Sequence, residues 1–259
     1  MTNSKVKIVF EDFRSDVPQP EQKKTTAADV AVAVIDALTT KGKSEKTAFH
    51  PEYANELITK AKNTILSARR ATKSSDAPHT ITVSGVVNDI STTTEYKEDK
   101  KLKGYSTVVS MSFHFVVDGN PDKTYDKIFK GTGTSYFYNV SVNESVSYAI
   151  NELTAYLKRY MNNFMPICGR ITELTEFNKK GVLKKVCIDV GSNWGITYSH
   201  NFIVYVKDAQ TGKSNRIGRI RVSDFKGEDM SFCRIKEGAE EIVKALNEGK
   251  DVYVESNED

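Results

Sequence analysis

The feature that most constrains the fold is the segment 109–117, where large apolar residues occupy every second position. The apolar set is Val109, Met111, Phe113, Phe115 and Val117, and between them lie Ser110, Ser112, His114 and Val116. Because successive side chains of a strand point to opposite faces, this alternation predicts a β-strand with one face buried. Such a strand needs paired neighbours and an apolar layer that covers its buried face.

A second pattern supplies that layer. Apolar residues recur at helical spacing from position 146 onward: Val146, Ala149, Ile150, Leu153, Leu157, Met161 and Phe164. They predict a long amphipathic helix that begins near Asn143 and ends before Pro166.

The other elements of this first part also follow from local patterns. Residues 6–10, 80–90 and 126–132 predict strands, and residues 91–104 predict a polar hairpin. Helices are expected at residues 25–38, with Thr26 and Asp29 forming a capping box, and from Pro51 to Ala68. The order predicts an α+β domain, in which helices cover a small, mainly antiparallel sheet.

Beyond Pro166 the sequence changes to short strands separated by glycine turns. Strands are predicted at residues 182–190, 201–207, 216–225 and 252–255, and one helix at 237–246. This pattern predicts a small β-barrel-like domain with one helix. We therefore expect two domains, residues 1–165 and 166–259.

Composition narrows the classes of function. A hydrophobic share of 39% excludes wholesale disorder, and a net charge of +3 is too small for a dedicated polyanion binder. No window reaches the roughly 18 consecutive apolar residues of a membrane helix. The sequence as given shows no secretory signal, which, if it is complete, favours a cytoplasmic protein.

The order of the elements and several short motifs resemble a known family. Ser84-Gly85, then residues 116–118 (Val-Val-Asp), then residues 131–133 (Gly-Thr-Gly) precede the long helix. This arrangement resembles the CsgG-like family of periplasmic proteins, which includes the curli secretion protein, the lipoprotein activators of penicillin-binding proteins and the related TolB amino-terminal fold. The resemblance covers residues 1–165.

The second part resembles the carboxy-terminal domain of FlgT, the flagellar T-ring protein. The similar segments are residues 188–191, 194–196, 202–205, 217–222 and 251–254. One departure is the turn at residues 199–201, where the family usually has Gly-Asp and this chain has Ser-His-Asn.

These resemblances imply a non-enzymatic protein-interaction and assembly module of a bacterial envelope, secretion or synthase-activation system. They imply a periplasmic or envelope location. This expectation conflicts with the cytoplasmic location that the lack of a secretory signal favours. The partners implied are other proteins, with self-association among the options.

The sequence offers no catalytic constellation, cofactor motif or metal-ligand cluster, so we expect no enzymatic activity, cofactor or metal. The histidines are scattered, and the cysteines are odd in number and far apart. Cys187 with His200 is the one thiol–base pair that a hairpin would bring near. We interpret Cys168 and Cys187, which lie in apolar stretches, as small hydrophobes, and expect all three thiols, Cys233 included, to be free.

Aromatic residues in predicted loops are the candidate anchors for a protein partner. Tyr136, Phe137 and Tyr138 lie between a strand and a helix, and Trp194 lies in a glycine turn. The alternative is that the run caps the sheet and that Trp194 closes the end of the barrel.

A single-stranded nucleic-acid-binding protein is the alternative function. Its contact residues would be Lys100, Lys101 and Lys103 in one hairpin, with Arg219 and Arg221 on a strand of the barrel. Interleaved acidic residues disfavour it, because phosphate binding needs a net positive potential.

Overall fold

The computed structural model of the chain describes residues 3–19, 47–99, 101–136, 140–208 and 210–258. The helix predicted at residues 25–38 lies outside them. The chain divides into two compact units. The hairpin unit comprises Val9–Thr64 and Ile81–Leu157, and the barrel unit comprises Met1–Ile8, Ile65–Thr80 and Lys158–Asp259.

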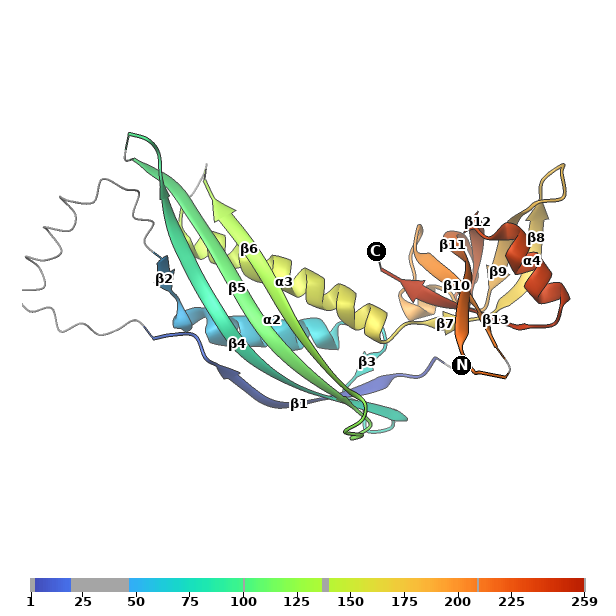
Figure 1. Cartoon of the computed structure of the whole chain (residues 1–259), viewed down its shortest axis with the longest axis horizontal. Helices are drawn as coiled ribbons and strands as arrows, with labels where there is room; N and C mark the ends of the chain where they lie inside the picture. The colour runs from blue at the N-terminus through green and yellow to red at the C-terminus, as the bar shows by residue number, and fades with distance from the viewer. Residues whose placement is uncertain (1–2, 20–46, 100, 137–139, 209, 259) are drawn as a thin grey trace, which may run out of the picture. The chain divides into compact units, whose positions relative to one another are not determined.

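The first sheet has the order β3-β1-β4-β5-β6, and the short strand β2 also pairs with β4 (Figure 1). The strands are β1 (Val6–Ser15), β2 (Thr47–Phe49), β3 (Ala71–Thr72), β4 (His79–Tyr96), β5 (Leu102–Val117) and β6 (Thr124–Ser135). β4, β5 and β6 form an antiparallel meander. The predicted alternation is confirmed, because Val109, Met111, Phe113 and Phe115 are at most 2% exposed.

The polar hairpin predicted at residues 91–104 is wrong in its extent. β4 and β5 stay paired as far as Tyr96 and Leu102, so most of that segment is strand. The buried hydroxyls of Thr92 and Thr107 lie 2.7 Å apart across the two strands, and Thr107 lies 2.7 Å from Ser145. Hydropathy alone predicts that such threonines face solvent. Because their hydroxyls bond to one another, they can instead be buried within a continuous strand.

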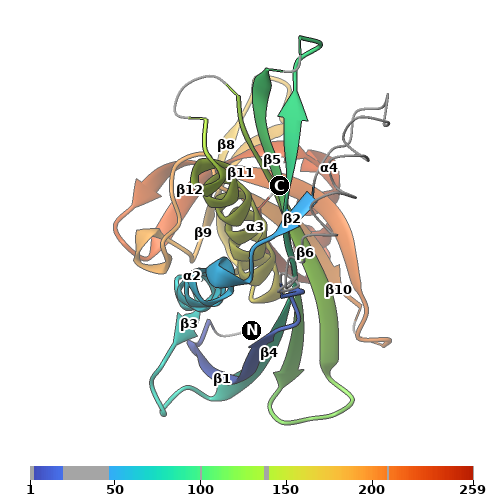
Figure 2. The ribbon, with the colours of Figure 1, turned by 90° about the vertical axis from the view of Figure 1, so that its left-hand side faces the viewer.

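Two helices lie on one face of this sheet (Figure 2). They are α2 (Ala54–Leu66), preceded by the 3₁₀ turn Pro51–Tyr53, and α3 (Val142–Phe164), both as predicted. α3 packs directly on β6, because a Cβ atom at Gly131 would collide with the carbonyl oxygen of Ala149. Glycine in this strand therefore permits the close approach of the helix.

The second sheet has the order β7-β13-β10-β11-β12-β9-β8, with antiparallel pairs throughout. The strands are β7 (Cys168–Gly169), β8 (Ile171–Phe177), β9 (Leu183–Ile188), β10 (Asn201–Lys207), β11 (Ser214–Lys226), β12 (Met230–Glu237) and β13 (Asp251–Asn257). The helix α4 (Ala239–Asn247) buries Ile242 against the curled sheet, in a core with Phe202, Ile220 and Val254. β8 and β12 were not predicted. The general α+β class with barrel-like sheets is confirmed.

Candidate interaction site

The tip of the β4–β5 hairpin exposes two large apolar side chains. Tyr96 and Leu102 are register partners at the last pair of the two strands, and they are 49% and 43% exposed. Directly opposite residues of an antiparallel pair hold their side chains side by side. The hairpin tip thus presents one joint aromatic–aliphatic surface, just beyond a register shift between Glu95 and Tyr96, and we call this pair the tip pair.

Tyr136 packs against the base of the same tip. Its hydroxyl donates a 2.6 Å hydrogen bond to Glu95, and the Nζ atom of Lys103 lies 4.8 Å from its ring centroid. The ring lies beside Gly104, where a Cβ atom would collide with it. Tyr136 is half-buried, so it caps this end of the sheet more than it protrudes. Phe137 and Tyr138 lie outside the described residues.

The same contacts shift the ionisation of two groups. The Lys103 ammonium, followed by the Tyr136 hydroxyl, holds the pKa of Glu95 below its usual value. The hydrogen bond to Glu95 raises the pKa of Tyr136. Both shifts favour a charged Glu95 and a neutral Tyr136, which is the state that keeps the hydrogen bond.

The residues considered for nucleic acid are engaged by neighbouring acceptors. Lys103 pairs with Glu95 at 2.8 Å and Lys101 with Asp99 at 3.1 Å, whereas Lys100 is outside the described residues. In the barrel unit, Arg219 lies 3.0 Å from Glu237, and Arg221 donates to the Ser199 carbonyl oxygen at 3.0 Å. Three of these four cations face a carboxylate, which reduces the positive potential that a polyanion needs.

Trp194 ends the 3₁₀ turn Ser192–Trp194 in the barrel unit. It is half-buried and packs against the barrel core, and the Nζ atom of Lys5 lies 5.3 Å from its ring centroid. A lysine over an indole face is a favourable cation–π arrangement. Much of the indole ring therefore makes contacts within the barrel unit and is not exposed to a partner.

A polar cluster of the barrel unit, in which Asn162 and His200 are buried and Arg69 and Glu258 are partly exposed, was not predicted. Arg69 forms an ion pair with Glu258 and donates a 3.4 Å hydrogen bond to Nδ1 of His200. Asn162 donates to the other Glu258 oxygen at 2.9 Å and accepts from the Arg69 backbone at 3.1 Å. These residues are far apart in the sequence, so only the fold brings them together.

The environment of His200 fixes its charge. Burial, followed by the nearby Arg69 guanidinium, lowers the pKa of His200 to about 4. The imidazole is therefore neutral at pH 7, and its Nδ1 atom accepts from Arg69. The ring also lies edge-on to Phe202, at 5.3 Å between centroids.

The three cysteines are free, as predicted, and all three are buried, which was predicted for Cys168 and Cys187 only. Cys187 and Cys233 are fully inaccessible, and burial raises the pKa of the Cys168 and Cys233 thiols. A raised thiol pKa lowers the thiolate fraction and with it the reactivity.

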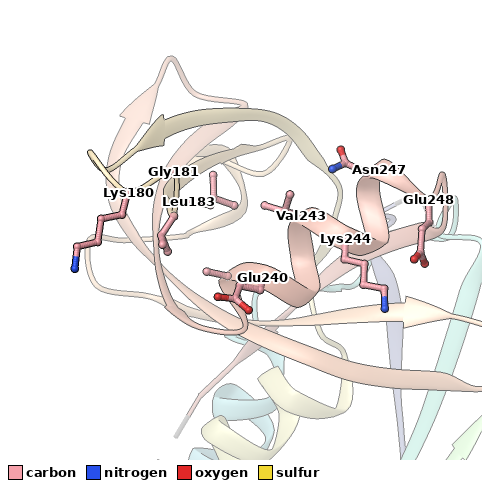
Figure 3. A pocket seen from close by; sticks show the side chains of 10 residues that line it. Lys180, Gly181, Leu183, Glu240, Val243, Lys244, Asn247 and Glu248 are labelled. Carbon is pink, nitrogen blue, oxygen red and sulfur yellow. The ribbon is translucent and has the colours of Figure 1, made fainter.

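A hollow of about 570 Å³ lies between α4 and the turn that joins β8 to β9 (Figure 3). Leu183 and Val243 supply apolar lining, and Lys180, Lys244 and Glu240 supply charges of both signs. Charged side chains that surround apolar ones in this way are common on protein surfaces, so the hollow does not by itself indicate a ligand.

In the described part of the chain, no three His, Cys, Asp or Glu side chains group as metal ligands would. None of the described helices is both long and apolar enough to cross a bilayer. Comparison with protein-family models and with curated proteins finds no match to this chain.

Proposed function

We propose that this protein is a non-enzymatic interaction module that docks a protein partner through the tip of its β4–β5 hairpin. The observation that carries the proposal is the tip pair, Tyr96 and Leu102, exposed side by side at the end of two long paired strands. Tyrosine is enriched among the residues that dominate binding energy at protein interfaces.

The hairpin suits this role because its backbone is ordered before a partner arrives. β4 and β5 are paired over nearly their whole length, and Tyr136 braces the strands next to the tip. A preorganised surface loses little conformational entropy on binding, so more of the contact energy remains as affinity. Phe137 and Tyr138, which follow Tyr136 in the sequence, are further candidate anchors.

The charges near the tip favour a protein partner over a nucleic acid. Lys101 and Lys103 face Asp99 and Glu95, which leaves an apolar centre with a balanced polar rim. Protein interfaces commonly have this composition. The alternative of single-stranded nucleic-acid binding therefore ranks second, and Trp194 ranks second to the tip pair as an anchor.

The biological setting that we propose follows from the sequence resemblance. A CsgG-like and TolB-amino-terminal-like domain at residues 1–165, with a FlgT-carboxy-terminal-like domain at residues 166–259, supports a role in envelope assembly, secretion or synthase activation. The partner would then be a protein component of such a system.

The test replaces the tip pair together, as the double variant Y96S/L102S. Tagged wild-type and variant proteins are used to capture partners from the native cell, and the captured proteins are quantified by mass spectrometry. The matched control is Tyr148→Ser, since Tyr148 is 51% exposed on α3 of the same unit. We expect the double variant to lose a specific partner that the control retains, with unchanged melting temperature.

Equal capture by both variants would refute the docking surface. Capture of single-stranded DNA that fades steeply with rising salt would favour the alternative function.

A further inference from the structure

The strand β6 ends the first sheet and has one unpaired edge. It pairs with β5 on one side and is the last strand in the sheet order, and no described strand pairs with its other side (Figure 1). Its pairing with β5 runs without a bulge from Thr124 to Ser135. Natural proteins usually protect an edge with a bulge, a proline or a short strand, because an open edge templates pairing with another chain. β6 has none of these three features, and the charged side chains that also protect edges are of both signs here: Asp126, Lys127 and Lys130.

One hydrogen bond shows which backbone groups point outward. The N–H of Thr132 donates to the Glu152 carboxylate on α3 at 2.5 Å. Since backbone groups alternate along a strand, the N–H and C=O groups of Asp126, Ile128 and Lys130 point away from β5 as well. Glu152 satisfies the edge at Thr132, and the outward backbone groups of Asp126, Ile128 and Lys130 are those that a second strand would pair with.

The side chains of this segment are complementary to a second copy of themselves. If two β6 strands pair antiparallel about a two-fold axis at Ile128, Asp126 of each copy lies opposite Lys130 of the other. Ile128 then meets Ile128, and the pairing stops short of Thr132, whose N–H is bonded to Glu152. Opposite charges and apolar pairs placed directly across two strands stabilise the pairing. An isologous contact of this kind closes as a dimer and does not grow into a fibre.

The exposure of these side chains fits that arrangement. Ile128 is 61% exposed, the highest value among the described aliphatic side chains that are exposed, and the Asp126 side chain is 82% exposed. His114, on the neighbouring strand, holds Asp126 at 2.7 Å on the open face of the sheet. In the two-fold arrangement the Ile128 side chains of the two copies would contact each other directly.

We propose that two copies of this chain associate edge to edge through β6, centred on Ile128, and form one sheet that continues across the dimer. The inference is independent of the proposed function, because it uses the β6 edge and leaves the hairpin tip free.

A charge-swap experiment tests the register. In Asp126→Lys alone or Lys130→Asp alone, both cross-strand pairs become like-charged, whereas a mixture of the two variants restores two opposite pairs. Sedimentation velocity should show a wild-type dimer, dimers about tenfold weaker for each variant, and recovery in the mixture. Asp122→Lys, an exposed charge change in the adjacent turn, should leave the dimer intact. A monomeric wild type, or variants as dimeric as the wild type, would overturn the proposal.

A cysteine at the two-fold axis tests the same geometry covalently. Hydrogen-bonded antiparallel partners have Cα atoms about 5.5 Å apart, within the range of a disulfide. Ile128→Cys should therefore form a disulfide-linked dimer under mild oxidation, since the native cysteines are buried. Lys127→Cys is the matched control, because residue 127 would face residue 129 of the other copy. Cross-linking at 127 and not at 128 contradicts the register. The Y96S/L102S variant should keep this cross-link, which separates a failure of dimerisation from a failure of partner docking.

Discussion

The neutral state of buried His200 makes the barrel unit sensitive to acid in a predictable range. The folded protein holds the pKa of His200 at about 4, against an ordinary value of 6.5. A base with a lowered pKa contributes stability that is complete above its ordinary pKa. That contribution is lost as the pH falls from 6.5 toward 4, because the unfolded chain binds the proton that the folded chain resists.

The size of the effect follows from the shift. A shift from 6.5 to about 4, at roughly 1.4 kcal/mol for each pH unit, corresponds to about 3 kcal/mol of unfolding free energy. Acidification also protonates carboxylates such as Glu258 next to Arg69, so the wild-type protein alone does not isolate the histidine.

The variant His200→Gln isolates it. Glutamine does not titrate, and its side-chain oxygen accepts a hydrogen bond as Nδ1 does. Every carboxylate remains in both proteins. Between pH 7 and pH 4, we therefore expect the wild type to lose about 3 kcal/mol more than the variant does.

Urea unfolding followed by tryptophan fluorescence measures this difference. Trp194 is the single tryptophan, and it lies in the barrel unit with His200, so its signal reports on that unit. Equal losses of stability in the two proteins would refute the reasoning, since they would mean that His200 is as easily protonated in the folded state as in the unfolded state.

Three further predictions concern other contacts. Gly131→Ala should lower the free energy of unfolding by at least about 2 kcal/mol, because the added methyl group would displace α3. Gly119→Ala should lower it by only about 1 kcal/mol, because the site has open space and the cost comes from its positive φ alone. Urea titration of both variants measures the difference. Tyr136→Phe should cost about 1 kcal/mol through the lost hydrogen bond and should raise the pKa of Glu95, which an NMR titration measures; an unchanged pKa would contradict the contact. The three thiols should react slowly with a disulfide reagent in the folded protein and rapidly in urea, and fast reaction without denaturant would argue against their burial.

The elements that sequence reasoning predicted well are those with one repeating physical cause. The alternation in 109–117 and the helical stripe of α3 both reflect burial on one face, and both are found at the expected places. The extent of the β4–β5 hairpin was not predictable in this way. Thr92 and Thr107 are buried because their hydroxyls bond to each other, and hydropathy does not record a partner.

The candidate sites likewise divide into residues that a local sequence pattern identified and residues whose contacts only the fold creates. Tyr136 and Trp194 stood out as aromatic residues in predicted loops, but their contacts with Glu95, Lys103 and Lys5 depend on the fold. The tip pair was missed because the predicted hairpin, residues 91–104, was too long and included both residues. Its signal was present, since an aromatic and an aliphatic residue flank a short charged turn. Arg69 and Glu258 carried no local signal, because isolated charged residues in a sequence are usually solvated surface, and His200 was considered only as a base near Cys187.

Site-specific photo-cross-linking at the hairpin tip tests whether the tip pair docks a protein partner. A photoreactive phenylalanine replaces Tyr96 in the native cell, and the same residue replaces Tyr148 as the control at a similarly exposed tyrosine. We expect one discrete protein adduct from position 96 that is absent from position 148. No adduct at position 96, or the same adducts at both positions, would show that the tip is not the docking surface.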